Sequence, residues 1–233
     1  MNNPLTKHYP IIFRGRRHGR RLRPNMEKLI VSELPKVQIK QIDGDLLAST
    51  LDLFPPNITE TWMEIGFGAG EHLAWQADNN PNIGFIGCEP FVNGVASLLR
   101  HASNKKLSNI RILPDDVRPF LSHLPDYCIS RLFILFPDPW RKSRHKSRRI
   151  IQESTLNEFH RLLKPSSELR IATDDPIYLR WILLHFNNHK GFEWLAQRPE
   201  HWRRRSDDWP ETRYEKKALV AGRSPVFLKY MKI

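Results

Sequence analysis

Short apolar runs alternate with amphipathic stretches along most of the chain, a pattern that predicts strands followed by helices. The most apolar run, residues 132–136, is expected to be the central strand of a sheet. Two apolar runs near the end of the chain, residues 192–197 and 226–232, are expected to pair with each other. The other expected strands are residues 62–65, 83–89, 109–113 and 169–174.

Apolar residues at helical spacing fill the stretches around these strands. Asn25 is expected to cap a helix that runs to Leu34 and is followed by Pro35. A second early helix, closed by Pro55-Pro56, is expected from Leu46, Leu47, Leu51 and Phe54. Later helices are expected after the first strand up to Asn79, and over residues 92–101, 150–163, 177–186 and 212–221, with Pro165 ending the third of these.

The alternation predicts an α/β fold with one mostly parallel sheet covered by helices on both faces. The final strand pair adds an antiparallel strand at the C-terminal end. Residues 25–233 are expected to form this single domain. Residues 1–24 contain arginines, glycines and prolines but no acid, which predicts a flexible basic arm.

Charge narrows the class of partner. The 233 residues carry a formal net charge of +12, which indicates an acidic partner, most commonly a nucleic acid. The N-terminus lacks the apolar segment of a secretory signal, and no run approaches the length of a membrane span. Cys88 and Cys128 are far apart, and the histidines show no ligand spacing. We therefore expect reduced thiols, no metal and a cytoplasmic protein without a membrane anchor.

The first expected strand runs into a turn with three alternating glycines, Gly66, Gly68 and Gly70, and a helix starts at once. Glycines permit positive φ and let a ligand approach the backbone. A dinucleotide-binding turn requires G-x-G-x-x-G, which would place its third glycine at position 71. That position is Glu71, which would repel a pyrophosphate, so a nicotinamide cofactor is disfavoured.

Acidic residues stand at the ends of the expected parallel strands. Glu89 lies about 20 residues past the glycines, where a carboxylate commonly binds the two hydroxyls of a ribose. An acid at the end of the third strand is placed to accept from an adenine amino group, although it is equally suited to cap the next helix. Since the carboxyl ends of parallel strands meet at one edge, one crevice is expected to gather Glu64, Glu89, Asp115 or Asp116, Asp138 and Asp174.

Several motifs in order resemble one family. The chain is similar to the bacterial tRNA (guanine-N7-)-methyltransferases, which are class I methyltransferases dependent on S-adenosylmethionine (SAM). The similarity begins near residue 60 and continues to the C-terminus. The motifs that carry it are Glu64-Ile65-Gly66-Phe67-Gly68, Gly87-Cys88-Glu89-Pro90, Phe136-Pro137-Asp138-Pro139-Trp140, Lys146-Ser147-Arg148-Arg149, Ala172-Thr173-Asp174 and Thr212-Arg213-Tyr214-Glu215.

This resemblance implies a Rossmann-like fold with a seven-stranded sheet, and a methyl transfer from SAM to N7 of a guanosine in the tRNA variable loop. It implies that Asp138 is the catalytic residue. It implies cofactor contacts from Glu64, Gly66, Gly68, Glu89 and Asp116, where Asp116 is preferred to Asp115 because the residues after it match better. It implies tRNA contacts from Lys142, Asp174, Thr212, Arg213, Tyr214 and Glu215.

The proposed chemistry needs no general base, because guanine N7 has a free lone pair and no proton. Catalysis then consists mostly of aligning the reacting atoms, with a carboxylate such as Asp138 beside the cation that forms. Trp140 is placed to stack on a base, but a tryptophan there equally suits core packing.

Two alternatives stay open. One is a SAM-dependent methyltransferase that acts on an exocyclic amino group of a base. The other is a basic RNA-binding protein that has lost its cofactor. The sequence is compatible with either a monomer or a homodimer.

Overall fold

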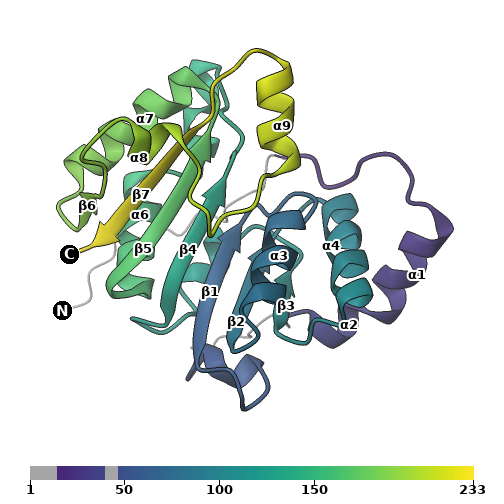
Figure 1. Cartoon of the computed structure of the whole chain (residues 1–233). Helices are drawn as coiled ribbons and strands as arrows, with labels where there is room; N and C mark the ends of the chain where they lie inside the picture. Colours follow the sequence, from purple (N-terminus) through teal and green to yellow (C-terminus); the bar gives the residue numbers. More distant parts are fainter. Residues whose placement is uncertain (1–14, 40–46) are drawn as a thin grey trace, which may run out of the picture.

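The computed structural model describes residues 15–39 and 47–233. Within them, one sheet has the strand order β3-β2-β1-β4-β5-β7-β6 (Figure 1). β1 to β5 are parallel to one another, and β7 runs antiparallel between β5 and β6. The expected central strand, β4, is indeed the middle strand of the seven. The strand bounds are β1 Glu60–Ile65, β2 Ile83–Cys88, β3 Ile110–Leu113, β4 Ile129–Leu135, β5 Leu163–Thr173, β6 Phe192–Trp194 and β7 Val226–Lys232.

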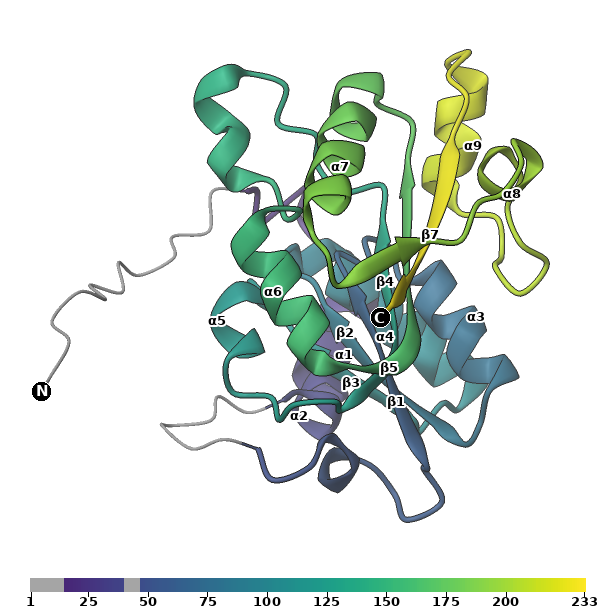
Figure 2. The ribbon, with the colours of Figure 1, turned by 90° about the vertical axis from the view of Figure 1, so that its left-hand side faces the viewer.

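Helices cover both faces of the sheet. Figure 1 shows α1, α3 and α4 beside β1 to β3, and Figure 2 shows α5, α6 and α7 together on the other face. α8 and α9 lie in the stretch between β6 and β7. The helix bounds are α1 Pro24–Ser32, α2 Leu34–Val37, α3 Glu71–Asn79, α4 Val92–Lys105, α5 Arg118–Leu121, α6 Glu153–Leu162, α7 Pro176–Asn188, α8 Glu200–Arg203 and α9 Arg213–Val220, with 3₁₀ helices η1 Thr50–Leu53 and η2 Ser143–Arg148.

Each face of the sheet has its own apolar core. One core joins Leu73 of α3 and Leu98 of α4 to the sheet. The other joins Phe159 of α6 and Ile182 of α7 to the opposite face. Burying a side chain of this kind contributes about 1.5–3 kcal/mol, so the two layers fix the strands firmly beneath their loops.

The strand register brings four loops to one edge. Ile65, the last residue of β1, is aligned with Cys88 of β2 and Ile134 of β4. Cys88 is in turn aligned with Leu113, the last residue of β3. The loops after β1, β2, β3 and β4 therefore open at the same edge, as the parallel sheet predicts.

The N-terminal helices differ from the prediction. α1 begins at Pro24 with an extended Arg23 before it, so Asn25 is not its cap. Pro35 does not follow a helix end but lies in the first turn of α2, where its missing N–H costs nothing. Leu46 lies outside the described residues. Of the second expected helix, the structure has only η1, which begins after a capping contact from Ser49.

The segment after β4 also differs from the prediction. Ile150 and Ile151 precede α6 rather than belonging to it, and α6 ends at Leu162. Pro165 does not end the helix but lies within β5. β5 pairs with β4 at Leu163 and again only from Glu168, so the residues between them, Pro165 included, bulge out of the ladder.

The predicted basic arm is described only in part, since residues 1–14 lie outside the described residues. Residues 15–23 pass alongside the first turn of α4. The Arg17 carbonyl oxygen accepts from the Val92 N–H at 2.9 Å, and the Gly19 N–H donates to Asn93 Oδ1 at 2.8 Å. The described part of the arm is therefore hydrogen-bonded to the domain. The flexibility of the arm stays a prediction for the other residues.

Within residues 15–39 and 47–233, no helix is long and apolar enough to cross a membrane. The same residues contain no group of three or more histidine, cysteine or acidic side chains placed to hold a metal ion. Cys88 and Cys128 both carry free thiols.

Candidate active site

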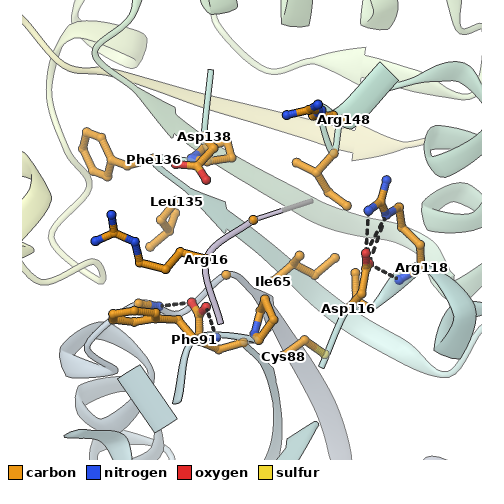
Figure 3. Close-up of a pocket in the computed structure, with 18 of the residues that line it drawn as sticks. Arg16, Ile65, Cys88, Phe91, Asp116, Arg118, Leu135, Phe136, Asp138 and Arg148 are labelled. Atoms are coloured by element: carbon orange, nitrogen blue, oxygen red, sulfur yellow. Dashed lines mark hydrogen bonds and ion pairs between the residues drawn. The ribbon is translucent and has the colours of Figure 1, made fainter. Parts of the chain in front are cut away.

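A cavity of about 500 Å³ opens at the edge where the four loops meet (Figure 3). The glycine turn after β1 and the loops after β2, β3 and β4 line it. α9 contributes Tyr214, and the described half of the arm contributes Gly15 and Arg16. Figure 3 shows Asp138 across the cavity from Cys88 and Phe91. The structure thus joins residues from both ends of the chain around one hollow.

The glycine turn shapes the floor of this cavity. Gly66 and Gly68 have φ of 74° and 57°, in the left-handed region that favours glycine. A Cβ on Gly66 would meet no protein atom within 4 Å, so the open space of the cavity begins there. A Cβ on Gly68 would lie 2.9 Å from Cε2 of Tyr214. Gly68 therefore lets α9 close over the turn.

Glu89 is a buried carboxylate in the cavity wall, only 8% exposed. Its Oε2 accepts from the Gly68 N–H at 2.8 Å, and its Oε1 accepts from the Phe91 N–H at 3.0 Å. Burial raises the pKa of Glu89 to about 7, and the nearby carboxylates of Asp138 and Glu64 act in the same direction. Glu89 is where the sequence predicts an acceptor for a ribose.

Glu64 is placed differently from the expectation that it lines the crevice. It is 2% exposed and is not among the residues that line the cavity. Its Oε2 lies 2.7 Å from Nδ1 of His72, which is also buried. Glu64 therefore ties the end of β1 to α3 from beneath the glycine turn, and a direct contact with a ligand stays a prediction.

Asp115 and Asp116 both line the cavity, and each has a basic partner. Asp116 accepts from the Arg118 N–H at 3.0 Å and from Arg118 Nε at 3.0 and 3.1 Å. Asp115 accepts from a terminal nitrogen of Arg17 at 2.6 Å. These pairs hold the two carboxylates at the mouth of the cavity, and which of them contacts a ligand stays a prediction.

Asp138 lies in the wall formed by the loop after β4. The residues Phe136 and Trp140, on either side of this short loop, have φ of 50° and 41°, which is unusual for residues with a side chain. The carboxylate is exposed to solvent on the cavity side, while its partial burial in the wall raises its pKa. This is a carboxylate placed to face a ligand in the cavity.

The residues expected to contact tRNA fall into three groups. Lys142 is exposed two residues after Trp140, which lines the cavity, and Asp174 lies outside the cavity in an ion pair with Arg223 (2.6 Å). Thr212 and Glu215 are buried: Thr212 Oγ1 accepts from the Glu215 N–H at 3.1 Å, which caps α9.

The remaining two residues of the T-R-Y-E motif are exposed at the start of α9. Arg213 donates its backbone N–H to Glu71 Oε1 at 2.9 Å, and its side chain is exposed. Tyr214 lines the cavity and stacks on Phe136, with ring centroids 6.4 Å apart. The motif therefore contains two buried residues that form the start of α9 and two residues whose side chains are exposed there.

Some cavity residues were missed by the sequence analysis. Arg16 and Phe91 line the cavity, as does Arg118. Arg118 follows two acids and carried a usable signal, because an arginine two residues after an aspartate is within reach of it. Arg16 gave no such signal, since its position depends on contacts between the arm and α4.

Comparisons with known proteins agree with this geometry. A family model described as "Putative methyltransferase" matches residues 59–228. The tRNA (guanine-N(7)-)-methyltransferase of Rhodospirillum rubrum is 48% identical over 219 residues, 93% of this chain and 86% of that protein. The protein of the same name from Zymomonas mobilis is 41% identical over 229 residues, 97% of each chain.

Solved structures support the fold. The 16S rRNA methyltransferase KamB superimposes with a TM-score of 0.57 over 81% of this chain and 94% of its own, at 13% identity. A structure described as an antibiotic-related methyltransferase gives 0.52 over 83% and 97% at 16% identity. The expected Rossmann-like class I methyltransferase fold is confirmed. With its close sequence relatives, the chain belongs to the tRNA (guanine-N7-)-methyltransferase family.

Proposed function

We propose that this chain transfers a methyl group from SAM to N7 of a guanosine in the variable loop of tRNA, with Asp138 at the reacting centre. The observation that carries the proposal is that Glu89 and Asp138 line one cavity, although they lie 49 positions apart in a chain that has more basic than acidic side chains. The Glu89 carboxylate suits a cofactor ribose, and the Asp138 carboxylate suits the guanine that is methylated.

The residues of the cavity fit SAM. Glu89 uses each carboxylate oxygen for one backbone N–H, which leaves each oxygen a second lone pair for a ribose hydroxyl. The open space above Gly66 admits a ligand close to the backbone. Asp115 and Asp116 both line the cavity, and one of them would accept from the adenine amino group. When bound, the cofactor supplies an electrophilic methyl group on a sulfonium.

Asp138 would act on the base rather than on a proton. Guanine N7 needs no deprotonation, but the purine becomes cationic as the new bond forms. A carboxylate at the cavity wall stabilises that developing charge. The same carboxylate can accept from N1–H and the N2 amino group of guanine, which would select guanine over adenine.

Exposed basic residues beside the cavity would bind the tRNA backbone. Lys142 and Arg144 are exposed on the segment after Asp138. Across the cavity mouth, Arg213 and Tyr214 are exposed on α9, whose first turn is built by Thr212 and Glu215. We assign direct tRNA contacts to Lys142, Arg144, Arg213 and Tyr214. Supporting roles fall to Asp174, Thr212 and Glu215.

With tRNA as the substrate, we propose that the reaction takes place in the cytoplasm. Either a monomer or a homodimer can present this cavity, and light scattering of the protein with and without tRNA distinguishes the two states.

The test uses the full chain, labelled SAM and an unmodified tRNA transcript. The product is reduced with borohydride and treated with aniline, which cleaves RNA at 7-methylguanosine. We expect cleavage in the variable loop, and much weaker but measurable cleavage with Asp138→Asn, a variant of the same size as the native residue. Label without cleavage indicates methylation of an exocyclic amino group instead. If neither label nor SAM binding is detected with any tRNA, the chain is a non-catalytic RNA-binding protein.

A further inference from the structure

Arg149 is buried beneath the loop that carries Asp138, and it binds the backbone of that loop. It is 1% exposed. Its Nε donates to the carbonyl oxygen of Pro139 at 2.8 Å, and a terminal nitrogen donates to the carbonyl oxygen of Trp140 at 3.3 Å. These are the two residues that directly follow Asp138, so the guanidinium fixes the backbone next to the carboxylate.

The contacts described for the Arg149 guanidinium are all with neutral groups, namely backbone carbonyls and aromatic rings. Its guanidinium carbon lies 5.3 Å from the ring centre of Tyr178 and 4.6 Å from that of Trp181, one helical turn apart on α7. The ion pairs found among residues 15–39 and 47–233 use other basic side chains. Burying a charged side chain without a carboxylate partner is unfavourable. The buried arginine at position 149 therefore calls for an explanation other than an ion pair.

The loop that Arg149 holds is one that needs support. Phe136 and Trp140 both have positive φ, a conformation that persists in residues with side chains only where the surroundings fix it. Two hydrogen bonds to the carbonyls of Pro139 and Trp140 supply such a restraint. Without it, the backbone that positions Asp138 is free to relax.

α7 anchors the restraint to the body of the protein. The Trp181 Nε1–H donates to the Ile151 carbonyl oxygen at 2.6 Å, and the Ile151 N–H donates to the Tyr178 hydroxyl at 3.4 Å. The two rings that contact Arg149 thus also hold the chain two residues after it. Arg148 and Ile150, on either side of Arg149, line the cavity, whereas Arg149 does not.

We propose that Arg149 is a positioning residue for methyl transfer, which acts by holding Pro139 and Trp140 so that Asp138 faces the reacting atoms. This inference rests on the proposed role of Asp138. A group misplaced by about 1 Å can lower a rate about 100-fold, so a residue that touches no ligand can still govern turnover.

The first test compares Arg149→Met and Arg149→Lys with the native chain, using kcat on tRNA transcript and SAM affinity by calorimetry. Methionine fills the space but donates to neither carbonyl, so we expect kcat to fall about 10- to 100-fold. SAM affinity should change less than about twofold, because the cofactor residues lie on other loops. Lysine can donate to one carbonyl and should recover part of the rate.

A double-mutant cycle shows whether Arg149 acts through Asp138. If it does, Asp138→Asn with Arg149→Met should be no slower than Asp138→Asn alone. Losses that multiply would overturn the inference, as would a native kcat in Arg149→Met. If Arg149→Met does not fold, Arg149→Lys decides: a lowered kcat with native SAM affinity supports the inference, and a native kcat overturns it.

Arg161 supplies a matched structural control. It donates to the carbonyl oxygens of Leu121 and Leu124, both at 2.8 Å, and is not among the residues that line the cavity. Arg161→Met should lower the melting temperature and leave kcat unchanged. A native kcat in Asp138→Asn would refute the proposed catalytic role itself, whereas a strongly lowered kcat in Asp138→Asn beside a native kcat in Arg149→Met would refute only the role of Arg149.

Discussion

Gly68 and Glu89 are joined by a hydrogen bond in which the glycine N–H donates to Glu89 Oε2 at 2.8 Å. The contact links the turn after β1 to the end of β2, so the predicted ribose acceptor is held by the glycine turn itself. The Phe91 N–H holds the second oxygen at 3.0 Å. The turn and the carboxylate therefore form one binding unit, and its charge state depends on pH.

SAM affinity should rise with pH through neutrality. Only the ionised carboxylate accepts from both ribose hydroxyls, and burial raises the pKa of Glu89 to about 7. With this pKa, about one tenth of Glu89 is ionised at pH 6 and about nine tenths at pH 8. The dissociation constant of SAM should therefore be about tenfold larger at pH 6 than at pH 8. Calorimetry of SAM binding between these pH values measures the change.

Glu89→Gln is the control for this pH dependence. The amide places an NH₂ group against one of the two backbone N–H donors, so SAM should bind weakly at every pH. A pH dependence that survives in this variant would assign the titration to another group.

The two glycines of the turn should respond differently to a methyl group. Alanine at either Gly66 or Gly68 must adopt positive φ, at a cost of roughly 1–2 kcal/mol in the free energy of unfolding. The added methyl of Gly66→Ala projects into the open cavity and should block SAM directly. That of Gly68→Ala meets the Tyr214 ring and should displace that ring from the cavity wall instead. Thermal unfolding and SAM affinity separate these effects.

Removing the Tyr214 ring distinguishes the two mechanisms. Tyr214→Ala should restore part of the SAM affinity in the Gly68→Ala background, because the clash is gone. It should restore none in the Gly66→Ala background. Equal rescue of both variants would contradict the structural account.

The Glu64–His72 contact should matter chiefly for stability. Both side chains are buried, and removing one leaves the other without its partner. Glu64→Gln and His72→Ala should each lower the free energy of unfolding by about 1–3 kcal/mol in urea titrations. Since Glu64 supports the turn from beneath, both should change SAM affinity alike. A much larger loss in Glu64→Gln than in His72→Ala would indicate that Glu64 contacts SAM.

Local patterns sufficed for much of the fold. The run 132–136 is apolar enough to identify the central strand, and residues 226–232 match β7. Spacing alone located Glu89 opposite the glycine turn. These features depend on residues close in sequence, where apolar periodicity and turn chemistry decide the structure.

Other features depend on contacts between distant segments. The side chain of Glu64 meets His72 rather than the cavity, which the position of Glu64 at a strand end does not reveal. Pro165 reads as a helix end but sits in a bulge permitted by the pairing of β4 with β5. Arg16 reaches the cavity only because the arm bonds to α4.

Binding of tRNA should depend on salt through the segment that follows Asp138. Lys142 and Arg144 are exposed there. Each phosphate contact contributes about 0.7–0.9 to the slope of log affinity against log salt concentration. Replacing both residues by glutamine should therefore lower that slope by about 1.5. Filter binding of tRNA over a series of salt concentrations measures it.

The matched control is a pair of lysines at the C-terminal end of α4, away from the cavity. Lys105 is the last residue of α4 and Lys106 is its C-cap. The first residues of α4 lie near the cavity, so these two charges sit at the opposite end of the helix, where Lys105 pairs with Asp78. Their replacement by glutamine removes the same charge from the protein but should leave the slope nearly unchanged. An equal reduction in both double variants would mean that tRNA senses only the net charge, and the proposed path beside Asp138 would have to be abandoned.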